Sequence, residues 1–456
     1  LSWENDYTLS IDLSKLQALQ SYTIKIDGSI AKNSQTNQPF DGNGDGVGGD
    51  NYELVITMAE PDVDAPKIVS TTPAMDGEVA YTLRPVIRVE FDEILNWNED
   101  KNGTALTLTD ATGKEYAGKL THDIIGEASV LHYYLAEDLP LDKCFLVTLA
   151  GGLADLSGNE TKETKFRFLS EYRGILSQET LLELDDIAGF WAPDGSGSSE
   201  GLTQESNFLT SDALSATGTG GSIKLTYDFD NTSTVSLWQI REYHSGQNIK
   251  KTTTDGVLTF WLYGDGSNNS VSAMVRAGTK ASGGLKHNLK TINFRGWNLI
   301  VWDLKNDEYA HFTGTDELVD AWKFDSFFLK HENTDADPNL PQQAWKGAIN
   351  IDKFEFNKFD NAAVRTAKIE DIQIGSGAVE ELGVEALSIV KSANVLTVSA
   401  PVAVEVIDVF NAAGVRVLSL APAAQMAEVA IDGLERGVYI VNVKAGSLAK
   451  TVKFVK

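Results

Sequence analysis

The chain has 456 residues, 42% of them apolar, so it is long enough for about three or four domains with packed cores. Its formal net charge of −27 argues against nucleic acid and anionic membranes as partners. No apolar run approaches the length of about 18 residues that a transmembrane helix needs, so we expect no membrane insertion. The single cysteine, Cys144, excludes an intrachain disulfide and is expected to be a small buried side chain.

The first part of the chain contains an internal repeat. Residues 22–31 (YTIKIDGSIA) and 145–154 (FLVTLAGGLA) share their apolar positions and one glycine at an offset of 123 residues. A polar loop and a further expected strand follow each of them. A complete copy therefore spans residues 65–170, and residues 1–60 hold the second half of another copy, a partial Ig-like domain.

The loop of the first copy has the composition of a calcium site. In the DGNGDG motif, Asp41, Asn43 and Asp45 place oxygen ligands at every second residue, and the glycines permit a tight wrap. The twelfth position, which is acidic in an EF-hand, is a tyrosine here, so Asp50 or Glu53 would have to take that role. The motif is equally compatible with a structural calcium ion and with a turn that holds no metal.

The complete copy resembles the bacterial immunoglobulin-like domains that act as spacers in surface proteins and polysaccharide-degrading enzymes. The resemblance is carried by residues 68–74 (IVSTTPA), residues 86–93 (VIRVEFDE), Leu135, Leu139 and the turn at 151–159. It implies an antiparallel β-sandwich. The expected role of residues 65–170 is that of a stalk.

A different composition begins near residue 181. Seven of the nine tryptophans lie between Trp191 and Trp345. No amphipathic run of helix length is present, and turns rich in Gly, Asp, Asn and Ser separate the expected strands. These strands are 222–229, 257–263, 270–276, 297–304, 324–330 and 348–356. We therefore expect an all-β jelly roll over residues 181–360.

This segment resembles the jelly-roll carbohydrate-binding modules of secreted glycosidases. The resemblance is carried by LDDI at 184–187, LYGDGS at 262–267, GWNL at 296–299 and GAINIDKFEF at 347–356. Carboxylates on the first and last strands of such modules often hold a structural calcium ion, so the resemblance implies Asp186 and Asp352 as ligands. The alternative is that both carboxylates face solvent or cap strand ends.

Sugar recognition needs flat apolar side chains for the C–H face of the sugar and polar groups for its hydroxyls. Trp191 lies in a Gly/Ser-rich stretch, Trp238 and Tyr243 flank Arg241, and Trp345 lies in a polar loop. These five residues form the predicted ligand-binding set. The alternative for each tryptophan is a place in the core of the sandwich.

Residues 361–380 are expected to be a linker, and residues 381–456 a small C-terminal Ig-like sandwich. Its strand pattern, with an Asn-x-x-Gly turn, a Gly-x-Tyr strand and a lysine-containing last strand, resembles the C-terminal sorting domain of the type IX secretion system of Bacteroidota. The residues that carry the resemblance are Asn411, Gly414, Gly437, Tyr439, Lys450 and Lys453. The Tyr-Pro-Asn-Pro opening that is common in these domains is absent. The resemblance implies the secretion machinery as a partner and a secreted or outer-membrane-anchored location at the cell surface.

The sequence thus predicts an all-β protein with tandem Ig-like sandwiches, a central jelly roll and a small C-terminal Ig-like sandwich. We expect a non-catalytic, glycan-binding surface protein, because no nucleophile elbow, P-loop or His-Glu-x-x-His motif is present. Two alternatives remain open. One is a polysaccharide-degrading enzyme: its catalytic site would lie either in the jelly roll, where Tyr243 and His244 near Arg241 are the local hint, or in a preceding region, so that this chain would be its C-terminal part. The other is a structural adhesin or filament component.

Overall fold

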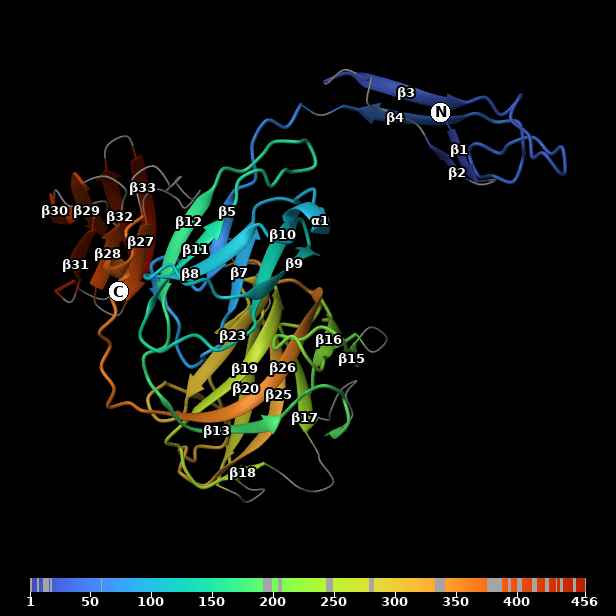
Figure 1. Cartoon of the computed structure of the whole chain (residues 1–456). Coiled ribbons are helices and arrows are strands. Elements are labelled where there is room, and N and C mark those ends of the chain that lie inside the picture. The colour runs from blue at the N-terminus through green and yellow to red at the C-terminus, as the bar shows by residue number, and fades with distance from the viewer. Residues whose placement is uncertain are drawn as a thin grey trace. The chain divides into compact units, whose positions relative to one another are not determined.

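The computed structural model of the chain is built almost entirely from β-strands, as expected (Figure 1). The structure describes residues 2–5, 8–10, 16, 19–58, 60–191, 199–203, 207–242, 249–278, 283–332, 341–374, 388–392, 395–399, 404–411, 416–422, 426–431, 433–434, 438–445 and 448–455. The chain divides into two compact units, residues 1–65 with 156–159 and residues 66–155 with 160–456.

The described part of the first unit consists of two small antiparallel sheets. One is formed by β1 (Ser2–Asn5) and β2 (Thr8–Ser10), the other by β3 (Ser21–Ile26) and β4 (Tyr52–Thr57). The side chains of Leu54 and Val55 on β4 are 42% and 65% exposed. This hairpin therefore leaves much of its apolar surface in contact with solvent.

The predicted repeat corresponds to two hairpins of one kind. Strand β3 lies 123 positions before β11 (Cys144–Leu149), and each strand leads through an irregular loop to an antiparallel partner, β4 or β12 (Thr164–Leu169). The loop of the second hairpin spans residues 150–163, whereas that of the first spans residues 27–51. The acidic DGNGDG segment lies in the longer loop, so it is a local elaboration of the repeated hairpin.

Residues 66–169 form a β-sandwich of two four-stranded sheets. Their strand orders are β5-β7-β10-β9 and β6-β12-β11-β8. The further elements are β5 (Ile68–Thr72), β6 (Gly77–Glu78), β7 (Val86–Phe91), α1 (Glu99–Asn102), β8 (Leu106–Asp110), β9 (Gly118–Ile125) and β10 (Ala128–Leu135). The core between the sheets includes Val89, Phe91, Leu131, Phe145, Val147, Phe166 and Phe168. Cys144 is a free, buried cysteine, as expected.

Residues 175–359 form a larger sandwich, in which all six expected strands are present. It begins before the expected boundary at residue 181, because β13 (Ile175–Leu182) pairs with β26 (Lys346–Phe359). One sheet has the order β15-β16-β26-β19-β23, and the other has the order β14-β17-β25-β20-β21-β24, with β18 paired to β25 and β22 to β20.

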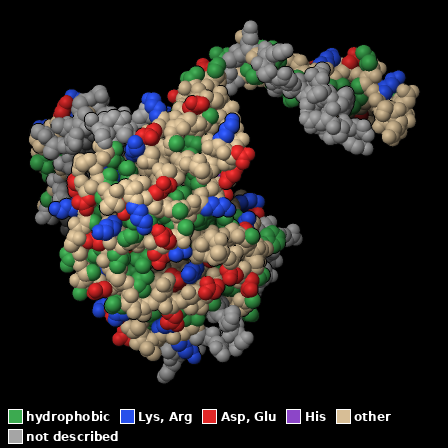
Figure 2. Space-filling model, in the orientation of Figure 1, with side chains coloured by type: hydrophobic (Ala, Val, Ile, Leu, Met, Phe, Trp, Pro, Cys, Tyr) green, Lys and Arg blue, Asp and Glu red, His purple; other side chains and the backbone are tan. Residues whose placement is uncertain are grey.

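The remaining strands of this sandwich are β14 (Phe190–Trp191), β15 (Phe208–Asp212), β16 (Ser222–Asp228), β17 (Val235–Glu242), β18 (Lys250–Lys251), β19 (Val257–Asp265), β20 (Ser270–Ala277), β21 (Leu285–His287), β22 (Lys290–Thr291), β23 (Arg295–Asp303), β24 (Ala310–Thr313) and β25 (Trp322–Glu332). Its core combines aliphatic side chains with many aromatic ones, which include Trp238, Phe260, Trp302, Trp322, Phe327 and Phe354. Figure 2 shows acidic and basic side chains interspersed on the visible face of this sandwich and of the Ig-like one.

The two sandwiches share a buried junction. Its apolar centre is formed by Val86, Ala216, Trp261 and Trp297. Beside it, Glu90 of β7 accepts hydrogen bonds from Arg88 and from Arg295 of β23, each 2.8 Å long. Glu90 and Arg88 are almost fully buried. Since removal of one partner would leave a buried charge uncompensated, this triad favours a single relative orientation of the sandwiches.

A histidine completes the junction. The Nε2 atom of His132 accepts a hydrogen bond of 3.1 Å from the backbone N–H of Trp297, and its Nδ1 atom lies 3.0 Å from the carboxylate of Asp123. Burial lowers the pKa of His132, although Asp123 acts in the opposite direction. The imidazole is therefore neutral near pH 7, with its proton on the Nδ1 atom that faces Asp123.

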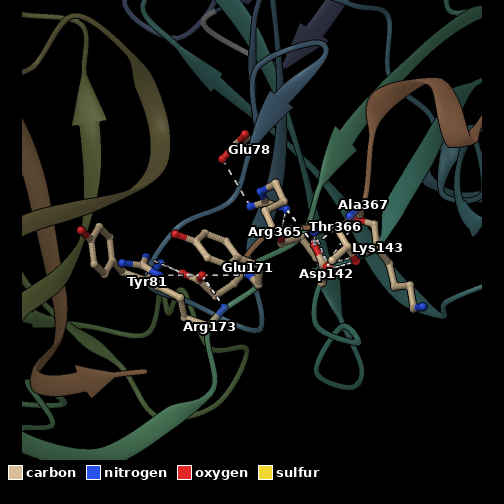
Figure 3. Close-up of polar contacts among 11 residues, drawn as sticks. Glu78, Tyr81, Asp142, Lys143, Glu171, Arg173, Arg365, Thr366 and Ala367 are labelled. Atoms are coloured by element: carbon tan, nitrogen blue, oxygen red, sulfur yellow. Dashed lines mark hydrogen bonds and ion pairs between the residues drawn. The ribbon is translucent and has the colours of Figure 1, made fainter. Parts of the chain in front are cut away.

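The connection between the sandwiches holds a second ion pair (Figure 3). The guanidinium of Arg173 donates two hydrogen bonds to Glu171, of 2.9 and 2.8 Å. The same guanidinium lies over the rings of Tyr81 and Phe359, at 4.2 and 5.2 Å from their centroids. Arg173 therefore contacts the Ig-like sandwich and the last strand of the jelly roll at once.

After the jelly roll the chain runs back along the Ig-like sandwich (Figure 3). Asp142 accepts hydrogen bonds from the backbone of Thr366 and Ala367, at 2.9 and 3.1 Å. Arg365 donates to the carbonyl of Ser170 at 2.9 Å.

Two further contacts extend this docking. The Cys144 thiol donates to the carbonyl of Ile369 at 3.5 Å, and Arg167 donates to the carbonyl of Ile372 at 2.9 Å. The first part of the expected linker is therefore fixed to the Ig-like sandwich as far as Ile372, and we call residues 361–372 the docked segment. It includes a short 3-10 helix, Ile369–Asp371.

The C-terminal residues form a small sandwich. One sheet has the order β27-β28-β31, with β27 (Ser388–Ser392), β28 (Val395–Ser399) and β31 (Met426–Ala430); the other has the order β30-β29-β32-β33, with β29 (Val406–Asn411), β30 (Arg416–Leu420), β32 (Val438–Ala445) and β33 (Leu448–Val455). Its core includes Val398, Ile407, Val409, Val429, Val441 and Val443. Among the described residues of the chain, no helix is long and apolar enough to cross a membrane.

Candidate functional site

The sheet that contains β17, β25 and β20 has one face in the core of the jelly roll and one face outside it. Trp238 and Ile240 of β17 and Phe327 and Leu329 of β25 belong to the main core. Side chains alternate between the two faces of a strand, so the intervening positions point away from this core. We call these positions, with their register partners on β14 and β18, the outer face. It consists of Trp191, Leu237, Gln239, Arg241, Lys250, Ser270, Ser272, Met274, Arg276, Lys323, Asp325, Ser326, Phe328, Lys330 and Glu332.

The outer face has an apolar part and a polar part. Leu237, Met274 and Phe328 are almost fully buried and form a cluster with Leu285, which lies next to β20 on β21. The other outward positions carry polar or charged side chains, except Trp191. The polar part is therefore the region in which a hydrophilic ligand could be bound.

Asp325 lies at the centre of the polar part. One of its carboxylate oxygens accepts a hydrogen bond of 2.7 Å from Arg276. The other accepts hydrogen bonds of 3.2 Å from Arg241 and 3.1 Å from Gln239. The side chains of Arg241, Arg276 and Asp325 are 23%, 16% and 9% exposed. These charged groups are thus held in a fixed arrangement that solvent can still reach.

A change of register explains why Asp325 points outward. The pairing of β20 with β25 shifts between Met274 and Val275, which are opposite Ser326 and Phe324. Asp325 is the extra residue on β25, as in a β-bulge. It therefore shares the outer face with Ser326, whose hydroxyl accepts a hydrogen bond of 3.0 Å from Gln239.

Trp191 adds a flat apolar surface beside this cluster. It is paired with Arg241 in the register of β14 and β17, and directly opposed residues of antiparallel strands point to the same face. The preceding residue, Phe190, packs against the core, as alternation requires. The Trp191 side chain is 49% exposed. An accessible indole therefore lies next to the guanidinium of Arg241.

Of the five predicted ligand-binding residues, the structure brings Trp191 and Arg241 together. The prediction for Trp238 is wrong, because its side chain is 0% exposed and lies in the core. Trp345 also packs against the core, with its ring 3.9 Å from that of His331, so it is not part of the outer face. Tyr243 lies outside the described residues.

Three polar residues of the cluster were not predicted from the sequence: Gln239, Arg276 and Asp325. Gln239 and Arg241 are two positions apart on one strand, and this spacing is the sequence signal that places both side chains on the same face. The strand 270–276 was expected, but its pairing with β25 brings Arg276 to Asp325 from a distant part of the chain. The sequence alone does not show which residues of two distant strands are opposite each other, so it could not predict this contact.

The acidic loop of the first unit brings the carboxylates of three predicted metal ligands together. Carboxylate oxygens of Asp41, Asp45 and Asp50 all lie within 4.8 Å of one another. Asp41 also accepts hydrogen bonds from the backbone N–H groups of two loop glycines, at 2.8 and 2.7 Å. The side chain of Asn43, the fourth predicted ligand, contacts Asp45: its NH₂ group donates to the Asp45 carboxylate at 3.2 Å, and its carbonyl oxygen accepts from the Asp45 backbone N–H at 2.9 Å. The three carboxylates offer the hard oxygen ligands that Ca²⁺ prefers.

The second predicted metal pair is Asp186 and Asp352. Asp186 is exposed and accepts a hydrogen bond of 2.7 Å from the backbone N–H of Ala188. The neighbouring Asp185 is also exposed and accepts a hydrogen bond of 2.8 Å from the backbone N–H of Gly221. Binding of a cation by Asp186 and Asp352 stays a prediction.

Asp352 itself is strongly perturbed. It is 2% exposed and accepts hydrogen bonds from the N–H of Ala216 and the hydroxyl of Ser215, at 2.8 and 3.0 Å. Burial raises the pKa of Asp352 to about 6; the two hydrogen bonds act against this rise, and the charge of Asp185 adds to it. A buried carboxylate in this state favours a proton or a cation as its partner.

Four of the six residues that carry the sorting-domain resemblance can be placed. Asn411 and Tyr439 are opposite each other in the register of β29 and β32, and Tyr439 is buried. Lys450 and Lys453 lie on β33, opposite residues of β32. Gly414 and Gly437 lie outside the described residues.

Comparison with solved structures gives distant similarities. A carbohydrate-binding module from the β-sandwich superfamily is 12% identical, over 65% of this chain and 99% of the module, with a TM-score of 0.26. The family 11 carbohydrate-binding module of a cellulosomal cellulase of Clostridium thermocellum is 11% identical, over 43% of this chain and 98% of the module, with a TM-score of 0.27. The bacterial S-layer protein SbsC is 11% identical, over 86% of this chain and 54% of the SbsC chain, with a TM-score of 0.20. At these values the likeness carries no assignment of a ligand.

Two segments match known families. Residues 62–169 match the family described as a bacterial Ig-like domain, and residues 392–456 match the secretion system C-terminal sorting domain. No curated protein matches the chain at a significant level. The chain therefore contains a bacterial Ig-like domain and a sorting domain of the type IX secretion system, and it is exported to the cell surface or secreted.

Proposed function

We propose that this protein is a non-catalytic glycan-binding protein of the cell surface, and that the polar part of the outer face is its binding site. The observation that carries the proposal is the pairing of the exposed Trp191 indole with Arg241, which is itself held by Asp325. The indole offers the apolar platform for a sugar ring, and the fixed charged groups offer donors and acceptors for hydroxyls.

Hydrolysis by paired carboxylates does not fit this face. Its two acidic residues, Asp325 and Glu332, lie seven positions apart on one strand, which corresponds to about 20 Å. Glycosidases of the usual kind need two carboxyl groups about 5–10 Å apart. Both oxygens of Asp325 already accept hydrogen bonds from arginines, and Glu332 is paired with Lys330. The arrangement supports binding better than catalysis.

The first prediction concerns Trp191. We expect Trp191→Ala to weaken binding of a recognised polysaccharide about 10- to 100-fold, because loss of an aromatic anchor costs about 1.5–3 kcal/mol. Affinity electrophoresis and titration calorimetry against a panel of soluble polysaccharides measure this change. Phe208→Ala is the matched control, since Phe208 is 53% exposed on the opposite sheet, and it should bind like the wild type.

The same panel distinguishes the other functions. Release of reducing ends or of unsaturated sugars would show an enzyme and contradict the non-catalytic part of the proposal. Binding to no polysaccharide, together with self-association in solution, would favour a structural adhesin or filament component.

We also propose a structural role for calcium in the loop that contains Asp41, Asp45 and Asp50. The proximity of the three carboxylates supports it. Such an ion would neutralise like charges and stiffen a long loop, without taking part in glycan binding.

A further inference from the structure

The outer face has the opposite charge balance to the rest of the chain. The whole chain has 65 acidic and 38 basic residues. The outer face has five basic residues, Arg241, Lys250, Arg276, Lys323 and Lys330, against Asp325 and Glu332. This local excess of cations is a specific feature of the face, because the composition of the protein favours the reverse.

The cations are arranged as a row across three strands. Lys250 is paired with Lys323 in the register of β18 and β25, and Lys323 is paired with Arg276 in the register of β25 and β20. Adjacent strands are about 4.8 Å apart, so the three basic side chains extend from backbone positions within about 10 Å of one another. Like charges that are directly opposed destabilise a sheet. We call Lys250, Lys323 and Arg276 the cationic row.

Within the described outer face, the acidic side chains do not balance the row. Asp325 is shared between Arg276 and Arg241, so one carboxylate serves two guanidinium groups. Burial and the charge of Arg276 both lower the pKa of the Lys323 side chain. The charge of Asp325 raises this pKa, but it offsets the lowering only in part. Lys250 adds a further repulsive charge. On the described outer face, basic side chains therefore outnumber acidic ones at this place.

We infer that the ligand of the outer face is an acidic polysaccharide, whose carboxylate or sulfate groups are bound by the cationic row while a sugar ring stacks on Trp191. This inference rests on the proposed function and adds the substrate class. A neutral glycan would cover the row without supplying a counter-charge, and desolvation of cations that outnumber their counter-charges is unfavourable. An anionic chain supplies that charge and relieves the repulsion within the row.

The decisive experiment compares polymers that differ only in charge. Polygalacturonate and its fully methyl-esterified form are tested with the whole protein by affinity electrophoresis and calorimetry at several salt concentrations. We expect polygalacturonate, or a sulfated galactan tested against its desulfated form, to bind at least about tenfold more tightly than the neutral counterpart. Its affinity should fall as salt increases, since charge pairing is screened.

Variants assign the effect to the row. We expect the double variant Lys250→Gln with Lys323→Gln to lose about tenfold or more in affinity for the acidic polymer, without a lower Tm, because it removes opposed like charges. Lys224→Gln, on the opposite sheet, removes a lysine whose side chain is 41% exposed and should have no effect. Trp191→Ala should weaken binding of the acidic polymer as well.

The outcomes separate this inference from the proposed function. Equal binding of charged and neutral polymers, both lost in Trp191→Ala, would overturn the inference and leave glycan binding intact. Binding of no polymer would overturn both. Equally tight binding of a single-stranded oligonucleotide, unaffected by Trp191→Ala, would show general anion exchange and would also overturn the inference.

Discussion

At the scale of single residues, Arg241 and Trp238 show how much of the candidate site can be deduced from the sequence. Both lie on one strand, three positions apart, and an odd separation places side chains on opposite faces. Arg241 therefore belongs to the outer face and Trp238 to the core. Alternation along a strand is visible in the sequence, and it excludes that both side chains contact one ligand on the same face.

Asp352 gives a prediction with a pH dependence. Its pKa in the folded chain is about 6, above the ordinary value of 3.8, so the folded state pays a free-energy cost once pH rises through this range. We expect Asp352→Asn to raise the free energy of unfolding by about 1–3 kcal/mol at pH 7 and to change it little at pH 4. The asparagine oxygen can still accept the hydrogen bonds from Ser215 and Ala216.

Thermal unfolding in the presence of a chelator measures this effect. Asp186→Asn is the control, because Asp186 is exposed and an asparagine can accept the same backbone hydrogen bond. A lower Tm of Asp352→Asn at pH 7 would contradict the argument, since it would show that the charged carboxylate stabilises the fold at that pH.

At the scale of elements, the strands were predictable and their register was not. The segment 324–330 was expected as a strand and lies within β25. Strict alternation from Phe324 would place Ser326 and Phe328 in the core, but the bulge at Asp325 reverses the pattern, so that Phe327 is inside. Bulges depend on the partner strand, which a single sequence does not reveal. This is why Asp325 was missed, although its strand was found.

The acidic hairpin loop gives a prediction at the same scale. We expect Ca²⁺ to bind with a Kd of about 0.1–1 mM, typical of extracellular sites, and Mg²⁺ to bind more weakly because the loop does not impose octahedral geometry. Asp45→Asn should abolish this binding, since it removes one of three converging carboxylates. Calorimetry after treatment with a chelator, in an Asp352→Asn background, isolates this loop from the jelly roll.

The matched control is Asp27→Asn in the same unit. Asp27 accepts a hydrogen bond from the backbone N–H of Ser29, which an asparagine can also do, and it lies outside the acidic segment. Calcium binding that survives Asp45→Asn unchanged would place the ion elsewhere and contradict the assignment to this loop.

At the scale of the whole molecule, the Ig-like sandwich and the jelly roll are joined by direct contacts and belong to one compact unit. Their junction combines apolar packing around Trp297 with the Arg88–Glu90–Arg295 triad, in which Arg88 and Glu90 are buried. The docked segment adds a second connection, because the chain that leaves the jelly roll returns to the Ig-like sandwich (Figure 3). The sequence predicted the domains, but charged residues more than 200 positions apart give no sequence signal for these contacts.

The docked segment gives the last prediction. Arg365 donates to the carbonyl of Ser170, lies 3.3 Å from Glu78, and stacks over the ring of Tyr172 at 4.6 Å. We expect Arg365→Ala to release the segment locally and to speed amide hydrogen exchange at Thr366 and Ala367 about 5- to 100-fold, because loss of about 1–3 kcal/mol raises the open population by that factor.

Hydrogen–deuterium exchange with mass spectrometry measures this release, with Lys368→Ala as the control at an exposed position of the same segment. The strands β29 and β32 of the sorting domain should exchange as in the wild type, since their hydrogen bonds lie within their own sheet. Unchanged exchange at Thr366 and Ala367 would mean that the other contacts, among them those of Asp142, hold the segment without Arg365, and it would contradict the prediction. Faster exchange there, with the sandwiches unaffected, would show that the chain between the jelly roll and the sorting domain is anchored by Arg365 rather than free.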